Sequence, residues 1–357
     1  MLDKNSCNIP ERFRDNPLFN EFHRGMNFGF MSRRGYYSQP EVKKQPELMQ
    51  KIGVNWVTLN ANLCQDTFFS SHVYLDPDFS SGEVELSEMA KNLHDHGIRI
   101  LLKPCLTSLD SAWMGAVNFP TATLDGTPVD FWSKWFESFR EALKYYADFS
   151  ERNHIEGLII GAEYFGTETQ DEQWRKCIET VRQHYSGPVT YETTQTALKR
   201  QVKWLNELDF LSMSFYPSGT EIAFRNDDQF HQVPHISLEE MIAALSKHLE
   251  FTQSFSDGFG KKPIAFTEIG TRSAHGNVIL PFNYTADSYY DGEEQANYME
   301  AVFSTFSKLP CWLGSYWWKW DETQYRPQYN GDPAGDRGFT IQGKPAEKVL
   351  RKWFANL

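Results

Sequence analysis

Eight short apolar runs, separated by segments with helical patterns, constrain this chain more than any other feature. Each run has the length of a strand and is nearly continuous in apolar residues, which is typical of parallel strands covered on both faces. The runs span residues 24–30, 54–63, 98–106, 158–165, 188–193, 209–217, 263–270 and 313–320. Strands that alternate with helices in this way predict a single (β/α)8 TIM barrel, and 357 residues fit the size of one such barrel.

The segments between the runs carry helix signals of unequal strength. Residues 129–154 are long and amphipathic, and residues 236–255 open with a Ser-x-x-Glu capping box at Ser237 and Glu240. The weakest crossover is 194–208, which is short and less periodic. A doubly wound open sheet is the alternative fold. It would lack its phosphate-binding loop here, because the sequence contains neither GxGxxG nor GxxxxGK[ST].

The chain shows no linker, low-complexity tract or other mark of a second domain. We therefore expect an N-terminal extension over residues 1–23 and a catalytic barrel over residues 24–357. Three long connections, 107–129, 218–236 and 271–292, follow the third, sixth and seventh runs. In a barrel, these connections leave the carboxyl ends of the strands, which is the face that carries active sites.

Charge and cysteine content exclude several classes of partner. The net charge of −12 argues against binding to nucleic acid or to an anionic membrane surface, and no apolar window is long enough to span a membrane. The five cysteines include no CxxC pair, so we expect neither a disulfide framework nor a metal site, and no cofactor. The start of the sequence lacks the apolar segment of a signal peptide, which predicts a cytoplasmic protein. The oligomeric state is left open.

Two of the runs end in carboxylates at corresponding points. Glu163 directly follows the apolar residues 158–160 and two small residues, and Glu268 follows IAFT. A carboxylate at the edge of a core is costly unless it is paired, hydrated or used in chemistry. Two such groups at a barrel mouth suit glycoside hydrolysis, in which one protonates the leaving oxygen and the other attacks the anomeric carbon or activates water. Glu168 lies farther along, past Gly166, and we expect it to cap the next helix.

Other polar and aromatic residues near strand ends are candidates for contacts with the sugar. Each of them would also fit an ordinary structural role, and Glu192 and Lys103 are better explained as ion-pair partners. Trp318 and Trp320 alternate with Trp317 along the last run, so we expect them to point to one side and stack on a sugar ring. The candidate substrate-binding residues are Trp318, Trp320, Lys103, Asn60, Trp113 and Glu192, and Tyr216 is the candidate hydrogen-bond donor to Glu268.

Four stretches carry a resemblance to a known family. They are FTEIG at 266–270, GAE at 161–163, LLKP at 101–104, and the C-terminal GSYWWKW with DRGFTIQGKPAEKVL. Together they resemble glycoside hydrolase family 113, the β-mannanases of the retaining TIM-barrel clan. The resemblance implies that Glu163 is the acid/base, that Glu268 is the nucleophile and that Tyr216 supports it. A retaining enzyme needs these two carboxyl groups about 5–5.5 Å apart.

The sequence departs from the family pattern at a few positions. Ala162 precedes the acid/base where much of the clan has Asn, and Cys105 stands where the family tends to have His. We expect a retaining enzyme that cleaves β-1,4-mannan or glucomannan oligosaccharides. The alternatives are a different β-linked sugar and a carbohydrate-binding barrel without activity. An aldolase using Lys103 is a third class, but a Schiff-base lysine requires a desolvated pocket without nearby carboxylates.

Overall fold

The computed structural model describes residues 7–200, 202–285, 287–320 and 336–357, and it confirms the predicted (β/α)8 barrel. The strands close into a barrel in chain order, β1 to β8. They are β1 (His23–Phe28), β2 (Trp56–Gln65), β3 (Arg99–Ser108), β4 (Gly157–Ala162), β5 (Val189–Thr194), β6 (Leu211–Ser214), β7 (Ile264–Ile269) and β8 (Trp312–Trp320). Each of them overlaps one of the eight apolar runs.

The helices follow the sequence signals closely. They are α1 (Pro40–Lys43), α2 (Gln45–Lys51), α3 (Glu83–Asp95), α4 (Phe131–Arg152), α5 (Asp171–His184), α6 (Ala197–Arg200), α7 (Leu238–Gly258), α8 (Gly292–Phe306) and α9 (Pro345–Phe354). The capping box of α7 is present: the Glu240 amide donates to the Ser237 hydroxyl at 3.2 Å, and the Ser237 amide donates to the Glu240 carboxylate at 2.8 Å. The crossover predicted to be weakest holds only the one-turn α6 and a short 3-10 helix, η6 (Lys203–Glu207).

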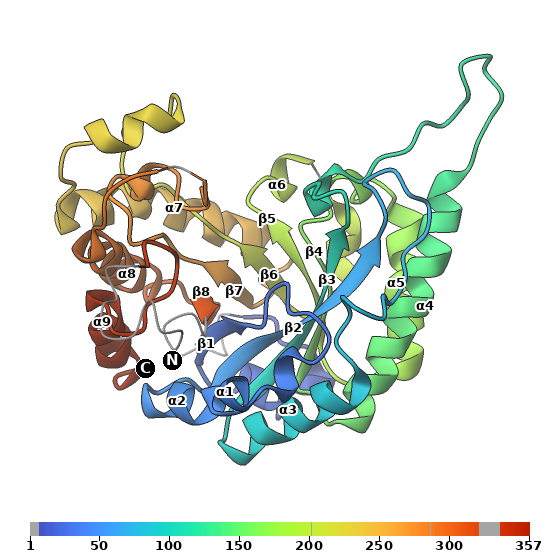
Figure 1. The fold of residues 1–357 in the computed structure, drawn as a ribbon, viewed down its shortest axis with the longest axis horizontal. Coiled ribbons are helices and arrows are strands. Elements are labelled where there is room, and N and C mark those ends of the chain that lie inside the picture. Colours follow the sequence, from blue (N-terminus) through green and yellow to red (C-terminus); the bar gives the residue numbers. More distant parts are fainter. Residues whose placement is uncertain (1–6, 201, 286, 321–335) are drawn as a thin grey trace. The chain divides into compact units, whose positions relative to one another are not determined.

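The chain divides into two compact units, which we describe separately. The first comprises residues 1–28, 44–57 and 215–357, and it contains β1, β7 and β8. Here β8 pairs with both β1 and β7, and α8 packs against α7 and α9 (Figure 1). The rings of Phe266, Phe306 and Trp312 fill the space between strands and helices, with centroids 5.0 and 5.4 Å from that of Phe266.

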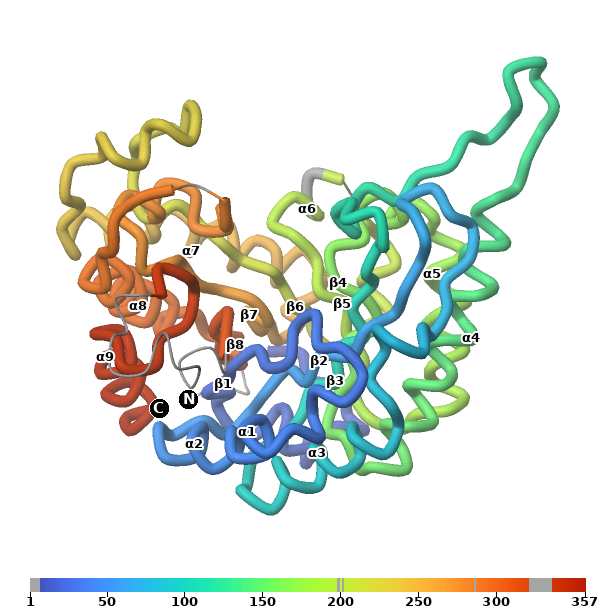
Figure 2. Tube along the Cα trace, viewed as in Figure 1, coloured from blue at the N-terminus to red at the C-terminus, as the bar shows by residue number. Residues whose placement is uncertain are grey.

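The second unit comprises residues 29–43 and 58–214, and it contains β3 to β6. Its helices α4 and α5 lie side by side (Figure 1). Trp174 of α5 stacks on Trp204 of η6 with ring centroids 4.6 Å apart. The connection from β3 to α4 extends away from these helices as a hairpin (Figure 2), which the antiparallel bridge between Ala122 and Pro128 closes.

Cysteine pairing is a point where the sequence prediction was wrong. Cys7 and Cys311 form a disulfide, with their Cα atoms 5.5 Å apart, and it ties the N-terminal segment to the start of β8. The two cysteines are 304 positions apart in sequence, so local spacing does not reveal their pairing. In the described part of the chain, no helix is long and apolar enough to cross a membrane.

Candidate active site

The candidate nucleophile, Glu268, is the penultimate residue of β7. It is partly exposed, whereas Thr267 and Ile269 on either side of it are buried. The Tyr216 hydroxyl donates a hydrogen bond to Glu268 Oε2 at 3.1 Å, which is the contact expected from the sequence. The main chain of the same segment is also fixed, because the Phe215 amide donates to the Glu268 carbonyl at 2.8 Å. The Tyr216 contact and the main-chain bond together fix the orientation of the Glu268 side chain.

Asn27 is a residue near the nucleophile that the sequence analysis did not single out. Its side-chain amide is buried at the end of β1 and donates to the carbonyls of Thr267 at 2.9 Å and Tyr316 at 3.1 Å. It therefore links β1 to β7 and β8 directly beside Glu268. The available signal was an asparagine inside an otherwise apolar run, since a buried amide must find partners.

The two tryptophans at the end of β8 differ in their surroundings. Trp320 is only 3% exposed, and its indole N–H donates to Gln45 at 2.8 Å. Trp318 is partly exposed. The expected alternation is interrupted because β8 advances by three residues, from Trp317 to Trp320, where β1 advances by two, from Met26 to Phe28. This geometry favours Trp318 over Trp320 as a platform for a sugar ring.

The candidate acid/base, Glu163, lies one residue past the end of β4. Its backbone has a φ of 57°, in the left-handed region that non-glycine residues rarely adopt. The Glu163 amide donates to the Glu192 carbonyl at 2.9 Å, and the Trp113 indole N–H donates to Glu163 Oε2 at 3.3 Å. Trp113 comes from the connection after β3 and is half exposed. Thus a loop tryptophan, which the sequence suggested as a substrate contact, touches the candidate acid/base itself.

Lys103 and Glu192 form a buried ion pair between β3 and β5. The Lys103 ammonium lies 2.8 and 3.0 Å from the two carboxylate oxygens of Glu192, and both side chains are almost fully buried. Their assignment as ion-pair partners is thereby confirmed, and a contact with the sugar stays a prediction for both. Asn60 is also buried, on β2, where its side-chain oxygen accepts a weak hydrogen bond from the Cys105 thiol at 3.2 Å.

Glu168 does not cap α5, so this prediction was wrong. The helix begins after Gln170 without a side-chain cap, and Glu168 is buried instead. Its carboxylate accepts a hydrogen bond from the Tyr191 hydroxyl at 2.8 Å and pairs with Arg200. Burial raises the pKa of Glu168 to about 6, although Arg200 and Tyr191 act in the opposite direction. The Glu168 carboxyl group thus has a structural role, joining Tyr191 and Arg200.

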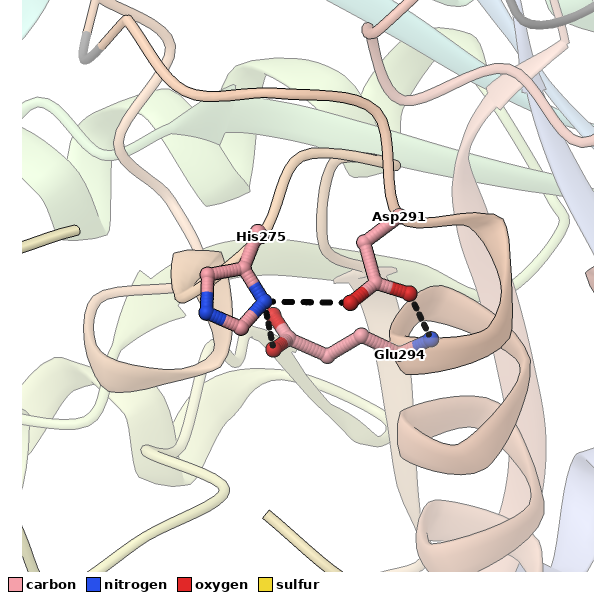
Figure 3. A group of neighbouring side chains, drawn as sticks. All are labelled: His275, Asp291 and Glu294. Carbon is pink, nitrogen blue, oxygen red and sulfur yellow. Dashed lines mark hydrogen bonds and ion pairs between the residues drawn. The ribbon is translucent and has the colours of Figure 1, made fainter. Parts of the chain in front are cut away.

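A separate cluster, His275 with Asp291 and Glu294, brings one imidazole nitrogen and two carboxylate oxygens within 4.8 Å of one another in the described part of the chain. Figure 3 shows His275 Nδ1 facing Asp291 at 3.1 Å and Glu294 at 3.6 Å. Nε2 lies 2.9 Å from the Val233 carbonyl, which only accepts, so it must carry a hydrogen. A second proton on Nδ1 satisfies both carboxylates. The cluster is therefore well explained as a buried ion-pair group fastening the β7–α8 connection.

The titration of this cluster follows from its burial. Desolvation raises the pKa of Glu294 to about 7, and the nearby charge of Asp291 acts in the same direction, against hydrogen bonds from the Gly276 and Val278 amides and the charge of His275. Desolvation lowers the pKa of His275, but its contacts with Asp291, the Val233 carbonyl and Glu294 outweigh this effect, and the net shift is upward. Both shifts favour the protonated forms of these groups.

A closed (β/α)8 barrel with glutamates at the ends of β4 and β7 is compatible with a TIM-barrel glycoside hydrolase. The model of Glycoside Hydrolase Family 113 matches residues 26–344, and the chain belongs to this family. The protein is therefore a glycoside hydrolase, as the resemblance implied.

Solved structures agree with this assignment. Two structures of family 113 β-1,4-mannanase, one of them a complex, are 26% identical in sequence, with TM-scores of 0.80 and 0.81, and each comparison covers 94% of this chain and 100% of the other. The β-mannanase AaManA from Alicyclobacillus acidocaldarius in complex with ManMIm is 25% identical, with a TM-score of 0.79 and coverage of 94% and 98%.

More distant structures share the fold alone. The β-glucuronidase from Ruminococcus gnavus is 13% identical with a TM-score of 0.58, over 94% of this chain and 50% of that one. The comparison with curated protein sequences found no significant match.

Proposed function

We propose that this glycoside hydrolase cleaves β-1,4-linked mannan or glucomannan oligosaccharides with retention of configuration, using Glu163 as acid/base and Glu268 as nucleophile. The observation that carries the proposal is the hydrogen bond from Tyr216 to Glu268 at the end of β7, which prepares one carboxylate for nucleophilic attack. The similarity to solved β-mannanases over nearly the whole chain supports the choice of sugar.

The mechanism has two displacements. In the first, the ionised Glu268 attacks the anomeric carbon while Glu163 donates its proton to the glycosidic oxygen, so the glycosidic bond breaks and a glycosyl ester forms. In the second, Glu163, now ionised, takes a proton from a water molecule. That water attacks the anomeric carbon and releases Glu268 as a carboxylate. Two inversions give net retention.

The surroundings of each glutamate fit its proposed task. The Tyr216 hydroxyl donates to Glu268 Oε2 and so holds this carboxyl group in place for attack. The left-handed backbone of Glu163 and its contact with Trp113 hold a proton donor in one orientation. Trp318, partly exposed at the end of β8, is the proposed platform for the sugar ring at the cleavage point.

The experiment that tests this proposal is a substrate panel read by proton NMR. Purified protein is incubated with mannobiose to mannohexaose and with the matching cello- and chito-oligosaccharides, and the first product anomer is recorded before mutarotation. We expect mannooligosaccharides to be cleaved fastest and the β anomer to appear first. Faster cleavage of another series would overturn the sugar assignment. Initial release of the α anomer would overturn the retaining mechanism. The variant Glu268→Ala, purified identically, controls for contaminating activity.

A further inference from the structure

We infer that Trp113 is a positioning residue for the acid/base: its indole N–H fixes one oxygen of Glu163, and a brace between two loops fixes Trp113. This inference rests on the proposed role of Glu163. The indole nitrogen lies 3.3 Å from Glu163 Oε2. Indole N–H is a donor only, so Oε2 must accept. A neutral carboxyl group accepts best at its carbonyl oxygen, so this contact favours the proton on Oε1, and Trp113 thereby biases which carboxyl oxygen faces the leaving group.

Two glycines allow the loops to come this close. Trp113 directly precedes η4 (Met114–Ala116), and η5 (Phe165–Thr167) follows Glu163 after one residue. A Cβ added at Gly166 would lie 1.9 Å from the Val117 carbonyl oxygen, so only glycine permits this approach of η5 to the end of η4. A Cβ at Gly115 would lie 2.4 Å from the Trp113 ring, so the indole folds directly over its own turn.

A chain of side-chain contacts supports the indole, beginning with the tilted Phe165 ring beside it. The Phe165 ring lies 6.2 Å from the Trp113 ring, centroid to centroid, and the Arg200 guanidinium carbon lies 3.5 Å above the Phe165 centroid. Arg200 also donates to the Phe165 carbonyl at 3.0 Å and pairs with the buried Glu168. A buried anion therefore anchors Arg200, Arg200 covers Phe165, and Phe165 supports the ring that touches the acid/base.

The backbone of Glu163 explains why such support is needed. A non-glycine residue in the left-handed region is strained relative to a normal conformation, and it persists only where its surroundings fix it. The Glu163 amide is held by the Glu192 carbonyl at 2.9 Å, which fixes the main chain. The contact with Trp113 fixes the carboxyl group at the other end of the side chain.

The kinetic test uses Trp113→Phe, which keeps an aromatic ring and removes the N–H. A poor leaving group needs the proton from Glu163, whereas 2,4-dinitrophenolate does not. We expect kcat/KM for mannohexaose to fall about 10- to 100-fold, the effect of one hydrogen bond to a charged group, and kcat/KM for a 2,4-dinitrophenyl β-mannoside to change less than about threefold. The alkaline limb of the mannohexaose pH profile should move upward, because losing the donor favours the protonated carboxyl. In a Glu163→Ala background, Trp113→Phe should have no further effect on mannohexaose.

Trp132→Phe is the matched control, since Trp132 packs edge-on against Phe119 at 4.8 Å. It should leave both substrates unchanged. An equal loss on both substrates in Trp113→Phe would assign the ring to sugar binding, and no loss would remove it from the site. Either result overturns the inference.

A measurement without substrate separates this inference from the proposed function. In ¹⁵N-labelled protein, the indole N–H resonance that disappears in Trp113→Phe is that of Trp113. It should move in Glu163→Gln and stay fixed in Glu268→Gln. An unmoved resonance in Glu163→Gln would overturn the inference whatever the enzyme cleaves. A moved resonance in a protein that cleaves no β-mannoside would support the contact while overturning the proposed substrate.

Discussion

The two units of the chain hold their glutamates in different ways. Glu268 lies within β7, where the register with β8 shifts between Phe266 and Ile269, and its neighbours Tyr216 and Asn27 come from the ends of β6 and β1. Glu163 lies just past its strand in a left-handed conformation, and its side chain touches Trp113 from a connecting loop. The proposed nucleophile is thus placed by a barrel strand, and the proposed acid/base by loop packing. Changes in the loops should alter proton transfer and leave nucleophilic attack intact.

The largest expected effect comes from removing the two glutamates. Glu268→Ala should lower kcat for mannohexaose on the order of 10⁴–10⁶-fold, as expected when a nucleophile is removed. Glu163→Ala should lower it by about 10²–10⁴-fold, the range of general acid–base catalysis. Circular dichroism shows whether each variant is folded. Wild-type activity in either folded variant would remove that residue from the mechanism.

The buried Lys103–Glu192 ion pair allows a stability test that is specific to the second unit. Lys103→Met leaves the Glu192 carboxylate buried without its cation, which should lower the free energy of unfolding by about 3–5 kcal/mol in urea titrations. The double variant Lys103→Met with Glu192→Leu removes both charges and should be more stable than the single variant. If the double variant is instead less stable than Lys103→Met, the two side chains stabilise the fold by more than neutralising each other's buried charge.

Tyr216→Phe tests the support of the nucleophile in the first unit. Loss of one hydrogen bond to a carboxylate should cost about 1.5–3 kcal/mol of transition-state stabilisation, or about 10- to 150-fold in kcat. Because the attack itself is affected, mannohexaose and the dinitrophenyl glycoside should lose activity together, unlike in Trp113→Phe. The exposed Tyr284 provides the control variant Tyr284→Phe. A loss confined to mannohexaose would place Tyr216 with the acid/base.

The smallest effect is a pH dependence of stability. Burial raises the pKa of Glu294 in the first unit to about 7 and that of Glu168 in the second to about 6. A raised folded-state pKa gives stability that is complete below the unfolded value of 4.5 and is lost as the pH rises through the folded value. The free energy of unfolding should therefore fall by about 1–3 kcal/mol between pH 5 and pH 8.

Two variants distinguish the contribution of Glu294, in the first unit, from that of Glu168, in the second unit. Glu294→Gln should flatten the curve up to about pH 7, whereas Glu168→Gln should flatten it only up to about pH 6. Denaturant titrations at four pH values give the curves. Identical curves for both variants and the wild type would contradict the assigned protonation of these carboxyls.

The strands and the two glutamates were predictable because their signals are local. Each apolar run reflects burial of a single segment, and Glu163, Glu268 and Tyr216 were found by counting strand ends. The contact of Tyr216 with Glu268 then follows from the neighbouring positions of β6 and β7 in the barrel.

The missed features depend on residues far apart in sequence. The Cys7–Cys311 disulfide joins positions 304 residues apart, and Arg200 meets Glu168 through loop packing. Trp320 was expected beside Trp318, but an irregular register with β1 interrupts the alternation. Disulfides are typical of oxidising compartments. A cytoplasmic location, expected from the sequence, stays a proposal. The Cys7–Cys311 disulfide argues against it.

Azide rescue of the two alanine variants tests the assignment of roles most directly. With a 2,4-dinitrophenyl β-mannoside, Glu163→Ala should form the glycosyl enzyme, which azide then attacks because no carboxylate blocks its approach. The account predicts recovered activity and a β-mannosyl azide, identified by NMR. Glu268→Ala lacks the nucleophile, so any azide product should be the α anomer from a single inversion. A β-mannosyl azide from Glu268→Ala, or an α-mannosyl azide from Glu163→Ala, would contradict the assignment.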